Sequence, residues 1–299
     1  YNRKDAMKDF SDWQEYEGSS EGSGRSEKIW LQNMENGKNG LFKFKKDIQT
    51  TDHISECIAC QIAGLLDIPC AKFEVGSYKG REGSMSYNII ENSEQGLIEG
   101  VSFITNIYPE YDPDNLIDCR TKRRYSIEMI IEAIEKYISC DDFIKMLMFD
   151  YLIGNSDRHQ SNWAMILEND KLRWSPLYDN GSSLCAYIPE EMVKSYLGKD
   201  ENRWRALVDT KSRSRIRCTF FEKKPPTHLA VMKYVKEHYF PIFTEFSEQI
   251  FTQIGTDEID NILKVYSAPE LSDDKKDLIT WYLLAKRNML KQIYLEKET

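Results

Sequence analysis

The segment Asp150–Gly181 reads DYLIGNSDRHQSNWAMILENDKLRWSPLYDNG, and the rest of the chain is organised around it. It opens with the end of an apolar stretch and continues into a dense polar loop, Gly154–Asn162. Two short apolar-rich runs, WAMIL and LRWSPL, then flank the polar residues ENDK. This order of apolar run, turn formers and apolar run predicts a β-hairpin directly after the polar loop.

The predicted hairpin brings polar side chains together. A turn centred in the middle of ENDK places Asn162 opposite Leu177, so that Asp179 leaves the same end of the ribbon roughly two residues further along. Asp157 precedes Asn162 in a loop without periodic pattern. We therefore expect three oxygen-bearing side chains, two of them carboxylates, at one end of the hairpin.

Such a cluster has two interpretations. Asp and Asn are common in polar loops because their side chains form Asx turns. Alternatively, the cluster is a magnesium and phosphoryl-transfer site, since magnesium prefers one or two carboxylates plus phosphate oxygens, and a reacting hydroxyl needs a carboxylate to accept its proton. The order D-x4-N, hairpin, D-x-G is the order of the H-R-D-x4-N and D-F-G elements of protein kinases.

The motif G-N-x-D-R-H-x-x-N followed by D-N-G-S-S-L resembles the HipA-like serine/threonine kinases. The resemblance implies that Asp157 is the catalytic base and that Asn162 and Asp179 bind magnesium. Arg158 and His159 match the motif without a certain role. It also implies an α+β, two-lobed protein kinase-like fold, with a small β-rich lobe over residues 1–92, a helical lobe over 93–299, and ATP as phosphoryl donor.

A Gly/Ser-rich stretch, Glu17–Lys28, precedes a predicted hairpin of strands at Ile29–Leu31 and Gly40–Phe44. Composition alone favours a linker. A Gly-rich loop that heads a hairpin also lets backbone N–H groups approach phosphates closely. The stretch is similar to the phosphate-binding loop of the HipA-like family, which implies that Gly22, Ser23 and Gly24 lie over the nucleotide.

Lys43 alternates with Phe42 and Phe44, so it faces away from these two aromatic side chains. A lone strand lysine is usually solvated, and Lys45 is a second candidate. The family pattern L-x-K-[FL] favours Lys43 as the phosphate-binding lysine. In the layout of the family the hinge that contacts adenine follows the next strands, at Ile90, Glu91 and Asn92.

The segment Thr51–Leu66 has apolar residues at helical spacing and a second stripe of small residues, on which Glu56 is the only charge. A surface glutamate is one interpretation. The resemblance favours the other, in which Glu56 forms an ion pair with Lys43 and orients it toward the nucleotide phosphates.

Further helices are predicted at Ser126–Ile138, Asp141–Ile153, and from His228 to the end of the chain, and the charged, aromatic stretch Tyr1–Tyr16 is compatible with a helix. Strands are predicted near residues 71–75 and 85–91, with a turn at 78–83. Two basic stretches, 120–124 (RTKRR) and 211–217 (KSRSRIR), are either solvated faces or binding sites for phosphate or acidic groups.

Composition limits the expected binding partners and the expected cellular compartment of the protein. A net charge of -9 and a pI near 5.2 argue against direct nucleic-acid binding. The seven cysteines are scattered, and we interpret Cys57 and Cys60, which form a C-x-x-C, as reduced core thiols rather than a zinc or redox site. No signal peptide and no apolar run of about 18 residues is present, so we expect a cytoplasmic protein without membrane contact, with signal-less secretion as the alternative.

We therefore expect an ATP-dependent serine/threonine protein kinase with an unidentified protein substrate. The alternatives are a phosphoinositide (lipid) kinase and a non-catalytic nucleotide-binding module. The resemblance also implies toxin activity, an antitoxin partner and autophosphorylation of a loop serine, for which Ser19, Ser20, Ser23 and Ser26 are candidates by position. About twenty residues precede the phosphate loop, so we expect a compact layout without the N-terminal subdomain of HipA.

Overall fold

A computed structural model of the protein describes residues 7–16, 27–46, 49–198 and 200–296. Internal contacts group the chain into two compact units. Unit 1 comprises Tyr1–Ile89, Pro176–Asp200 and Ile254–Tyr282, and unit 2 comprises Ile90–Ser175, Glu201–Gln253 and Leu283–Thr299. The expected boundary between lobes at residue 92 stays a prediction.

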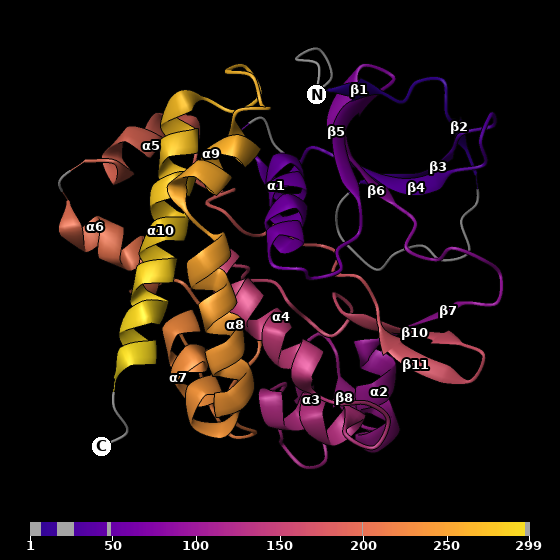
Figure 1. The fold of residues 1–299 in the computed structure, drawn as a ribbon. Coiled ribbons are helices and arrows are strands. Elements are labelled where there is room, and N and C mark those ends of the chain that lie inside the picture. The colour runs from indigo at the N-terminus through magenta and orange to yellow at the C-terminus, as the bar shows by residue number, and fades with distance from the viewer. Residues whose placement is uncertain (1–6, 17–26, 47–48, 199, 297–299) are drawn as a thin grey trace. The chain divides into compact units, whose positions relative to one another are not determined.

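Unit 1 contains a six-stranded sheet in the order β1-β5-β6-β4-β3-β2, seen as the curved indigo and violet strands in Figure 1. Its strands are β1 (Lys8–Asp9), β2 (Gln14–Glu15), β3 (Lys28–Gln32), β4 (Asn39–Phe44), β5 (Phe73–Tyr78) and β6 (Arg81–Tyr87). Its helices are α1 (Asp52–Leu65), α5 (Glu190–Tyr196) and α9 (Thr256–Leu263), and α10 (Asp273–Leu295) runs from unit 1 into unit 2.

The predicted hairpin at Ile29–Leu31 and Gly40–Phe44 is confirmed as β3 and β4, which pair antiparallel. The side chains of β4 alternate as expected, because Phe42 and Phe44 are buried while Lys43 lies on the other face. The two phenylalanines belong to a cluster of buried residues on one side of the sheet: Phe10, Trp13, Leu31, Phe42, Phe44, Tyr78 and Met85.

The interpretation of Tyr1–Tyr16 as a helix is wrong for its described part. Lys8–Asp9 forms β1, parallel to β5, and Gln14–Glu15 forms β2, antiparallel to β3. Between them Phe10 and Trp13 are buried, with ring centroids 5.3 Å apart. Burial of these rings against the sheet, which is a long-range effect, outweighs local helix propensity.

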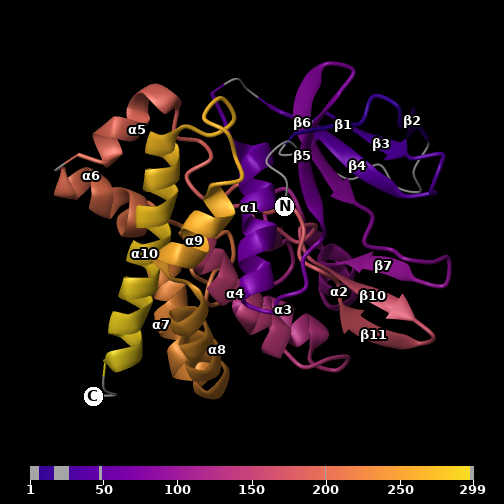
Figure 2. The ribbon, with the colours of Figure 1, turned by 45° about the horizontal axis from the view of Figure 1, so that its top comes forward.

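The observed limits of strands β5 and β6 differ from the predicted ones. Lys79 and Gly80 both have positive φ, 48° and 76°, as a two-residue hairpin turn requires. This tight turn lets β6 begin at Arg81, four residues before the predicted start. Helix α1 covers the sheet on the side of β5 and β6 (Figures 1 and 2), and its predicted limits are confirmed within one residue.

Unit 2 contains a three-stranded sheet, β11-β10-β7, a two-stranded ribbon and several helices. The strands are β7 (Gly96–Glu99), β8 (Tyr111–Asp112), β9 (Ile117–Asp118), β10 (Ala164–Glu168) and β11 (Lys171–Trp174). The helical elements are α2 (Gly100–Ile107), α3 (Ile127–Ile134), α4 (Asp141–Ile153), α6 (Glu201–Arg205), a π-helix (Ala206–Thr210), α7 (His228–His238) and α8 (Phe240–Gln253).

The hairpin after the polar loop is confirmed as β10 and β11, with Glu168 opposite Lys171 as the predicted turn requires. Both turn residues, Asn169 and Asp170, have positive φ. The predicted second strand is too long, however. β11 ends at Trp174, and Leu177 instead donates its N–H to the carbonyl of Pro69 at 2.8 Å. Pro176 has no N–H to continue the ladder with β10.

Helix α4 confirms the helix predicted at Asp141–Ile153, and ten of its eleven residues from Phe143 onward are buried, the exception being Lys145. It ends at Gly154, whose φ of 69° is the left-handed conformation that glycine adopts without strain. The chain thereby turns sharply from a rigid, buried helix into the polar loop.

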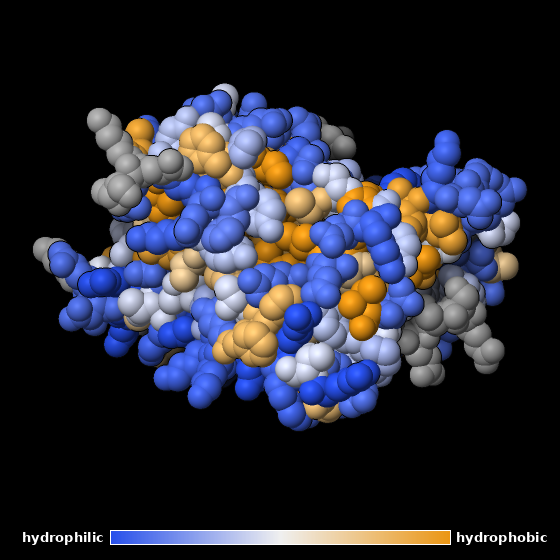
Figure 3. All heavy atoms as spheres, turned by 90° about the horizontal axis from the view of Figure 1, so that it is seen from below, coloured by the Kyte–Doolittle hydropathy of each residue, from blue (hydrophilic) through white to orange (hydrophobic). Residues whose placement is uncertain are grey.

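In the described part of the chain, no helix is both long and apolar enough to cross a membrane. Figure 3 shows one face of the molecule, on which hydrophilic residues predominate over scattered apolar ones.

Candidate functional site

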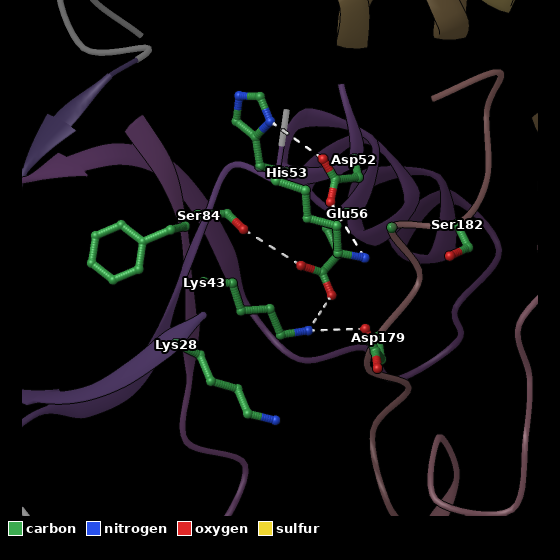
Figure 4. Close-up of a pocket in the computed structure, with 11 residues that line it drawn as sticks. Lys28, Lys43, Asp52, His53, Glu56, Ser84, Asp179 and Ser182 are labelled. Atoms are coloured by element: carbon green, nitrogen blue, oxygen red, sulfur yellow. Dashed lines mark hydrogen bonds and ion pairs between the residues drawn. The ribbon is translucent and has the colours of Figure 1, made fainter. Parts of the chain in front are cut away.

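In unit 1, Lys43 lies between two carboxylates (Figure 4). Its Nζ atom is 2.7 Å from Glu56 Oε1 and 3.0 Å from Asp179 Oδ1. Strand β4 supplies the lysine, helix α1 supplies Glu56, and the segment after Leu177 supplies Asp179. The ion pair expected between Lys43 and Glu56 is therefore present, and the structure adds Asp179 as a partner that the sequence did not assign to this lysine.

The side chains of this ion pair are sparingly exposed, 21% for Lys43 and 3% for Glu56. Burial alone would lower the pKa of Lys43, but attraction by Asp179 and Glu56 outweighs it and raises the pKa, so the ammonium stays charged. Burial raises the pKa of Glu56, an effect that the ion pair with Lys43 opposes. Ser84 Oγ also donates to Glu56, at 3.4 Å.

These residues line a hollow in unit 1 whose wall carries three lysines. It is lined by Lys28, Lys43, Phe44, Lys46, Asp52, His53, Glu56, Ser84, Asp179, Gly181 and Ser182. The three ammonium groups can contact an anionic ligand such as a nucleotide phosphate, although the carboxylates of Asp52, Glu56 and Asp179 balance their charge in this lining. The competing candidate Lys45 is not in the lining and forms its ion pair with Glu82 at 3.1 Å.

The segment Asp179–Gly181 has the backbone that brings Asp179 to this hollow. Asp179 has a φ of 56°, which Asp adopts more readily than most residues. Asn180 is fully buried, and its carbonyl accepts a hydrogen bond from Ser183 Oγ at 2.6 Å. A Cβ at Gly181 would lie 3.0 Å from the carbonyl oxygen of Asp52, so the glycine permits close approach to the start of α1.

In unit 2, a buried ion pair holds the polar loop to the end of α4. Arg158 Nε and Nη2 donate to the two carboxylate oxygens of Asp150 at 2.9 and 2.8 Å, and both side chains are at most 5% exposed. Arg158 Nη1 also donates to the carbonyl of Asn162 at 2.7 Å. Arg158 is therefore a structural anchor of the loop.

A second buried chain of hydrogen bonds reaches the loop from the C-terminal part of unit 2. His228 Nε2 lies 2.9 Å from the carbonyl oxygen of Asn155, and its Nδ1 lies 2.9 Å from Ser212 Oγ. Lys286 Nζ donates to Ser212 Oγ at 2.8 Å. Burial, followed by repulsion from Lys286, lowers the pKa of His228 to about 3, so this imidazole is neutral.

Asp157 and Asn162 lie together in this anchored loop. Asn162 Nδ2 donates to the backbone carbonyl of Asp157 at 2.8 Å, an arrangement that leaves its Oδ1 as an acceptor. The carboxylate of Asp157 is half-buried. His159 accepts a hydrogen bond from the backbone N–H of Ser161 through Nδ1, at 3.2 Å, which stabilises the turn between them.

The donor types of the expected magnesium ligands fit that ion. Asn162 offers an amide oxygen in unit 2 and Asp179 a carboxylate in unit 1, and magnesium takes hard oxygen ligands, often with phosphates completing the set. Among the described residues, no group of three or more His, Cys, Asp or Glu side chains could hold a metal by itself. The role of Asn162 and Asp179 in magnesium binding therefore stays a prediction.

The structure says less about the roles of the remaining expected site residues. Gly22, Ser23 and Gly24, and the serines at 19, 20 and 26, lie outside the described residues. Ile90 is half-buried, while Glu91 and Asn92 are exposed in a turn where the Glu91 N–H donates to Gln95 Oε1 at 2.9 Å. The structure leaves their role as an adenine-binding hinge a prediction.

Sequence reasoning missed the residues that fix the polar loop, namely Asp150, Ser212, His228 and Lys286. Asp150 carried a usable signal, because a carboxylate within a helix that is apolar all round has to be paired once it is buried. No local signal connects the other three to the loop, since even Ser212, the first of them in the sequence, lies 57 positions after Asn155.

Comparisons with known proteins show the family of the chain and similar folds. The family model described as "HipA-like C-terminal domain" matches residues 20–238. Among solved structures, a Helicobacter pylori proinflammatory kinase, CtkA, matches with a TM-score of 0.80 and 17% identity, covering 98% of this chain and 100% of that one. HipA from a Shewanella oneidensis MR-1 toxin–antitoxin complex with HipB and operator DNA matches with a TM-score of 0.58 and 10% identity, covering 95% and 69%.

No protein of curated function matches the chain by sequence. At such low identities the structural likeness establishes the fold alone. It confirms the predicted α+β, two-lobed kinase-like fold.

Proposed function

Because the chain belongs to the family of HipA-like C-terminal domains, we propose that it is a protein kinase that transfers the γ-phosphoryl group of ATP to a serine or threonine hydroxyl. The observation that carries this proposal is the position of Lys43 between Glu56 and Asp179. A charged lysine held by a helix glutamate, beside an aspartate of a D-x-G element, is the arrangement with which kinases bind ATP phosphates.

In this proposal each of the expected site residues has its own part in the reaction. Lys43 binds phosphate oxygens of ATP, and Glu56 holds the lysine in place. Asp179 and Asn162 would hold magnesium, which when bound neutralises the negative charge of the phosphates. Ile90–Asn92 would contact adenine, and Gly22–Gly24 would cover the phosphates. Positioning and charge neutralisation then supply most of the rate enhancement.

Asp157 is proposed as the base. The substrate hydroxyl oxygen forms a bond to the γ-phosphorus while the bond from that phosphorus to the β–γ bridging oxygen breaks, and ADP leaves with the electron pair. Asp157 accepts the hydroxyl proton. The Asp150–Arg158 ion pair and the His228–Asn155 hydrogen bond support the proposal, because a base acts efficiently only when its loop is held in place.

The test is incubation of the full chain with γ-labelled ATP and magnesium in the presence of a general protein substrate. Asp157→Ala is expected to lower transfer by about 10²–10⁴-fold while ATP still raises the melting temperature. Asp114→Ala, the same change at an exposed aspartate of unit 2, serves as the matched control. Full activity of Asp157→Ala would refute its role as base.

Analysis of the labelled product distinguishes the substrate classes. Label recovered as phosphoserine or phosphothreonine supports a protein kinase. Label that appears only on phosphoinositide vesicles would instead show a lipid kinase. ATP binding without transfer to either substrate would show a non-catalytic nucleotide-binding module.

Autophosphorylation of Ser19, Ser20, Ser23 or Ser26 is also proposed, on the family resemblance alone. A phosphate there would add about 1.5 to 2 negative charges near ATP, so we expect inhibition. Mass spectrometry after incubation with ATP, with Asp157→Ala as control, tests this. The absence of any modified serine in the active protein would exclude it.

The toxin role and the antitoxin partner rest on the likeness to HipA, whose solved complex contains HipB and DNA. If they apply here, expression of the chain should arrest growth, whereas Asp157→Ala should not. A neighbouring gene product that relieves the arrest and co-purifies with the chain would be the antitoxin.

A further inference from the structure

The two basic stretches, 120–124 and 211–217, lie next to each other in unit 2. The backbone N–H of Arg217 donates to the carbonyl of Tyr125 at 3.2 Å, and the N–H of Ile127 donates to the carbonyl of Arg217 at 2.8 Å. Segments about ninety positions apart in the sequence are thereby paired through their backbones. The proposed transfer reaction uses neither of them.

Arg217 is the unusual member of this pairing. Its side chain is buried, with 7% of the residue exposed, and its Nε atom has no hydrogen-bond partner. Across the described ranges of the chain, its guanidinium forms no ion pair. A buried charge without hydrogen bonds or a counter-ion is costly, so such a group usually has an anionic partner.

The charges around Arg217 are mostly positive. Burial lowers the pKa of Arg217, and repulsion by Arg124 and Arg215 adds to the effect. An opposing charge is Glu222, whose Oε2 already accepts a hydrogen bond from the backbone N–H of Cys218 at 2.9 Å. The guanidinium groups of Arg124, Arg215 and Arg217 therefore leave an excess of positive charge here.

We propose that Arg124, Arg215 and Arg217 form a binding site for a phosphate monoester dianion, of the kind carried by a phosphorylated serine or threonine side chain. An excess of positive charge suits a dianion. Guanidinium groups also bind phosphate oxygens through pairs of hydrogen bonds. The ligand would also compensate the charge of Arg217, whose Nε has no hydrogen-bond partner. Arg215 is exposed and Arg124 is half-buried, so a ligand can reach these two side chains from solvent.

This site goes beyond the proposed transfer reaction and is tested without ATP or magnesium. The probes are inorganic phosphate, the peptide acetyl-Gly-phosphoserine-Gly-amide, and the same peptide with glutamate in place of phosphoserine. Binding to the full chain is measured by calorimetry at low and high salt. We expect both phosphates to bind, the glutamate peptide to bind more weakly, and salt to reduce affinity.

Arg215→Gln is the decisive variant, because its side chain is exposed and its loss should not disturb folding. Removal of one charge-assisted contact should weaken phosphopeptide binding about tenfold. Arg173→Gln makes the same change at an exposed arginine of β11 and should have no effect. Equal affinity of wild type and Arg215→Gln for the phosphopeptide would overturn the proposal, as would equal binding of the glutamate peptide.

Arg217→Gln tests the buried position, with the thermal melting curve as a check on folding. If the variant folds, its phosphopeptide affinity should fall more than that of Arg215→Gln. Asp157→Ala should bind the phosphopeptide like the wild type. Loss of phosphopeptide binding and loss of phosphoryl transfer are therefore separable results. Tighter binding of the phosphopeptide than of inorganic phosphate would identify a side-chain source for the ligand.

Discussion

Arg158 donates two hydrogen bonds to the carboxylate of Asp150 inside unit 2, and the pair is almost completely buried. Eight positions separate the two residues. The last turns of α4 and the polar loop are thereby connected by a planar, two-point contact. Asn155 Nδ2 donates to the same carboxylate at 3.0 Å, so Asp150 fixes the loop at two points before Asp157 and Asn162 take their positions.

Asp150→Asn should destabilise the protein, because it leaves the Arg158 guanidinium buried without its counter-ion. The expected loss in the free energy of unfolding is about 3–5 kcal/mol, measured by urea denaturation. Arg158→Lys keeps the charge but loses the two-point contact, so a smaller loss is expected. Asp114→Ala, at an exposed position, is the control. A change below 1 kcal/mol in Asp150→Asn would contradict the role of this pair as anchor.

His228 should make the stability of the protein depend on pH. Its pKa is lowered from 6.5 to about 3 in the folded protein. As pH falls below 6.5, the unfolded chain takes up a proton that the folded chain does not, so stability is lost between pH 6.5 and about 3. In the range pH 6 to 5 this group should contribute roughly 1 kcal/mol per pH unit.

His228→Gln removes this titration, and its free energy of unfolding should fall less steeply with decreasing pH than that of the wild type. Denaturation at pH 7, 6 and 5 measures both slopes. The comparison of slopes remains valid even if the variant is less stable at every pH. Parallel pH dependence of the two proteins would show that His228 is not held neutral in the fold.

Local patterns in the sequence predicted the elements whose limits depend on local chemistry. Asn169 and Asp170 placed the turn of the β10–β11 hairpin, and the spacing of apolar residues placed α1 and α4. Strands β1 and β2 were missed, since strands of two residues exist only through pairing with β5 and β3.

The candidate site was predictable only in part, because some of its contacts join residues that are far apart in the sequence. Glu56 was identified as the partner of Lys43 because it is the only charge on a small-residue stripe and because the family resemblance favours it. Asp179 was expected near magnesium but not next to Lys43, from which it is 136 positions distant. His228 and Asn155 are 73 positions apart, and nothing in the sequence around either residue indicates their contact.

Half-buried Cys60 should be more reactive than buried Cys57 in unit 1. A hydrogen bond from Cys70 lowers the pKa of Cys60 to about 7, whereas burial raises the pKa of Cys57 well above its usual value. Iodoacetamide reacts with thiolates, so the modification rate of Cys60 should be half-maximal near pH 7. Cys57 should stay unmodified in the folded protein. Peptide mapping by mass spectrometry measures both rates.

Cys70→Ser provides the matched comparison for this prediction. A serine at position 70 is of similar size but changes the hydrogen bond to Cys60, so the midpoint of Cys60 modification should move to higher pH. A midpoint that stays near pH 7 in this variant would assign the lowered pKa to another group.

The last prediction concerns the separate roles of Lys43 and Glu56 in the use of ATP. Glu56→Gln keeps the shape of the glutamate but removes its charge, so Lys43 keeps only Asp179 as a charged partner. If Glu56 serves to hold the lysine toward ATP, its loss should raise KM for ATP and lower kcat/KM about tenfold. Glu74→Gln is the control, because Glu74 pairs with Lys8 and Lys72, which lie outside the lining of the hollow. Lys43→Met should lower kcat/KM further than Glu56→Gln, and the double variant should be no worse than Lys43→Met alone, because Glu56 acts through the lysine. Additive losses in the double variant would show instead that Glu56 contributes to catalysis independently of Lys43.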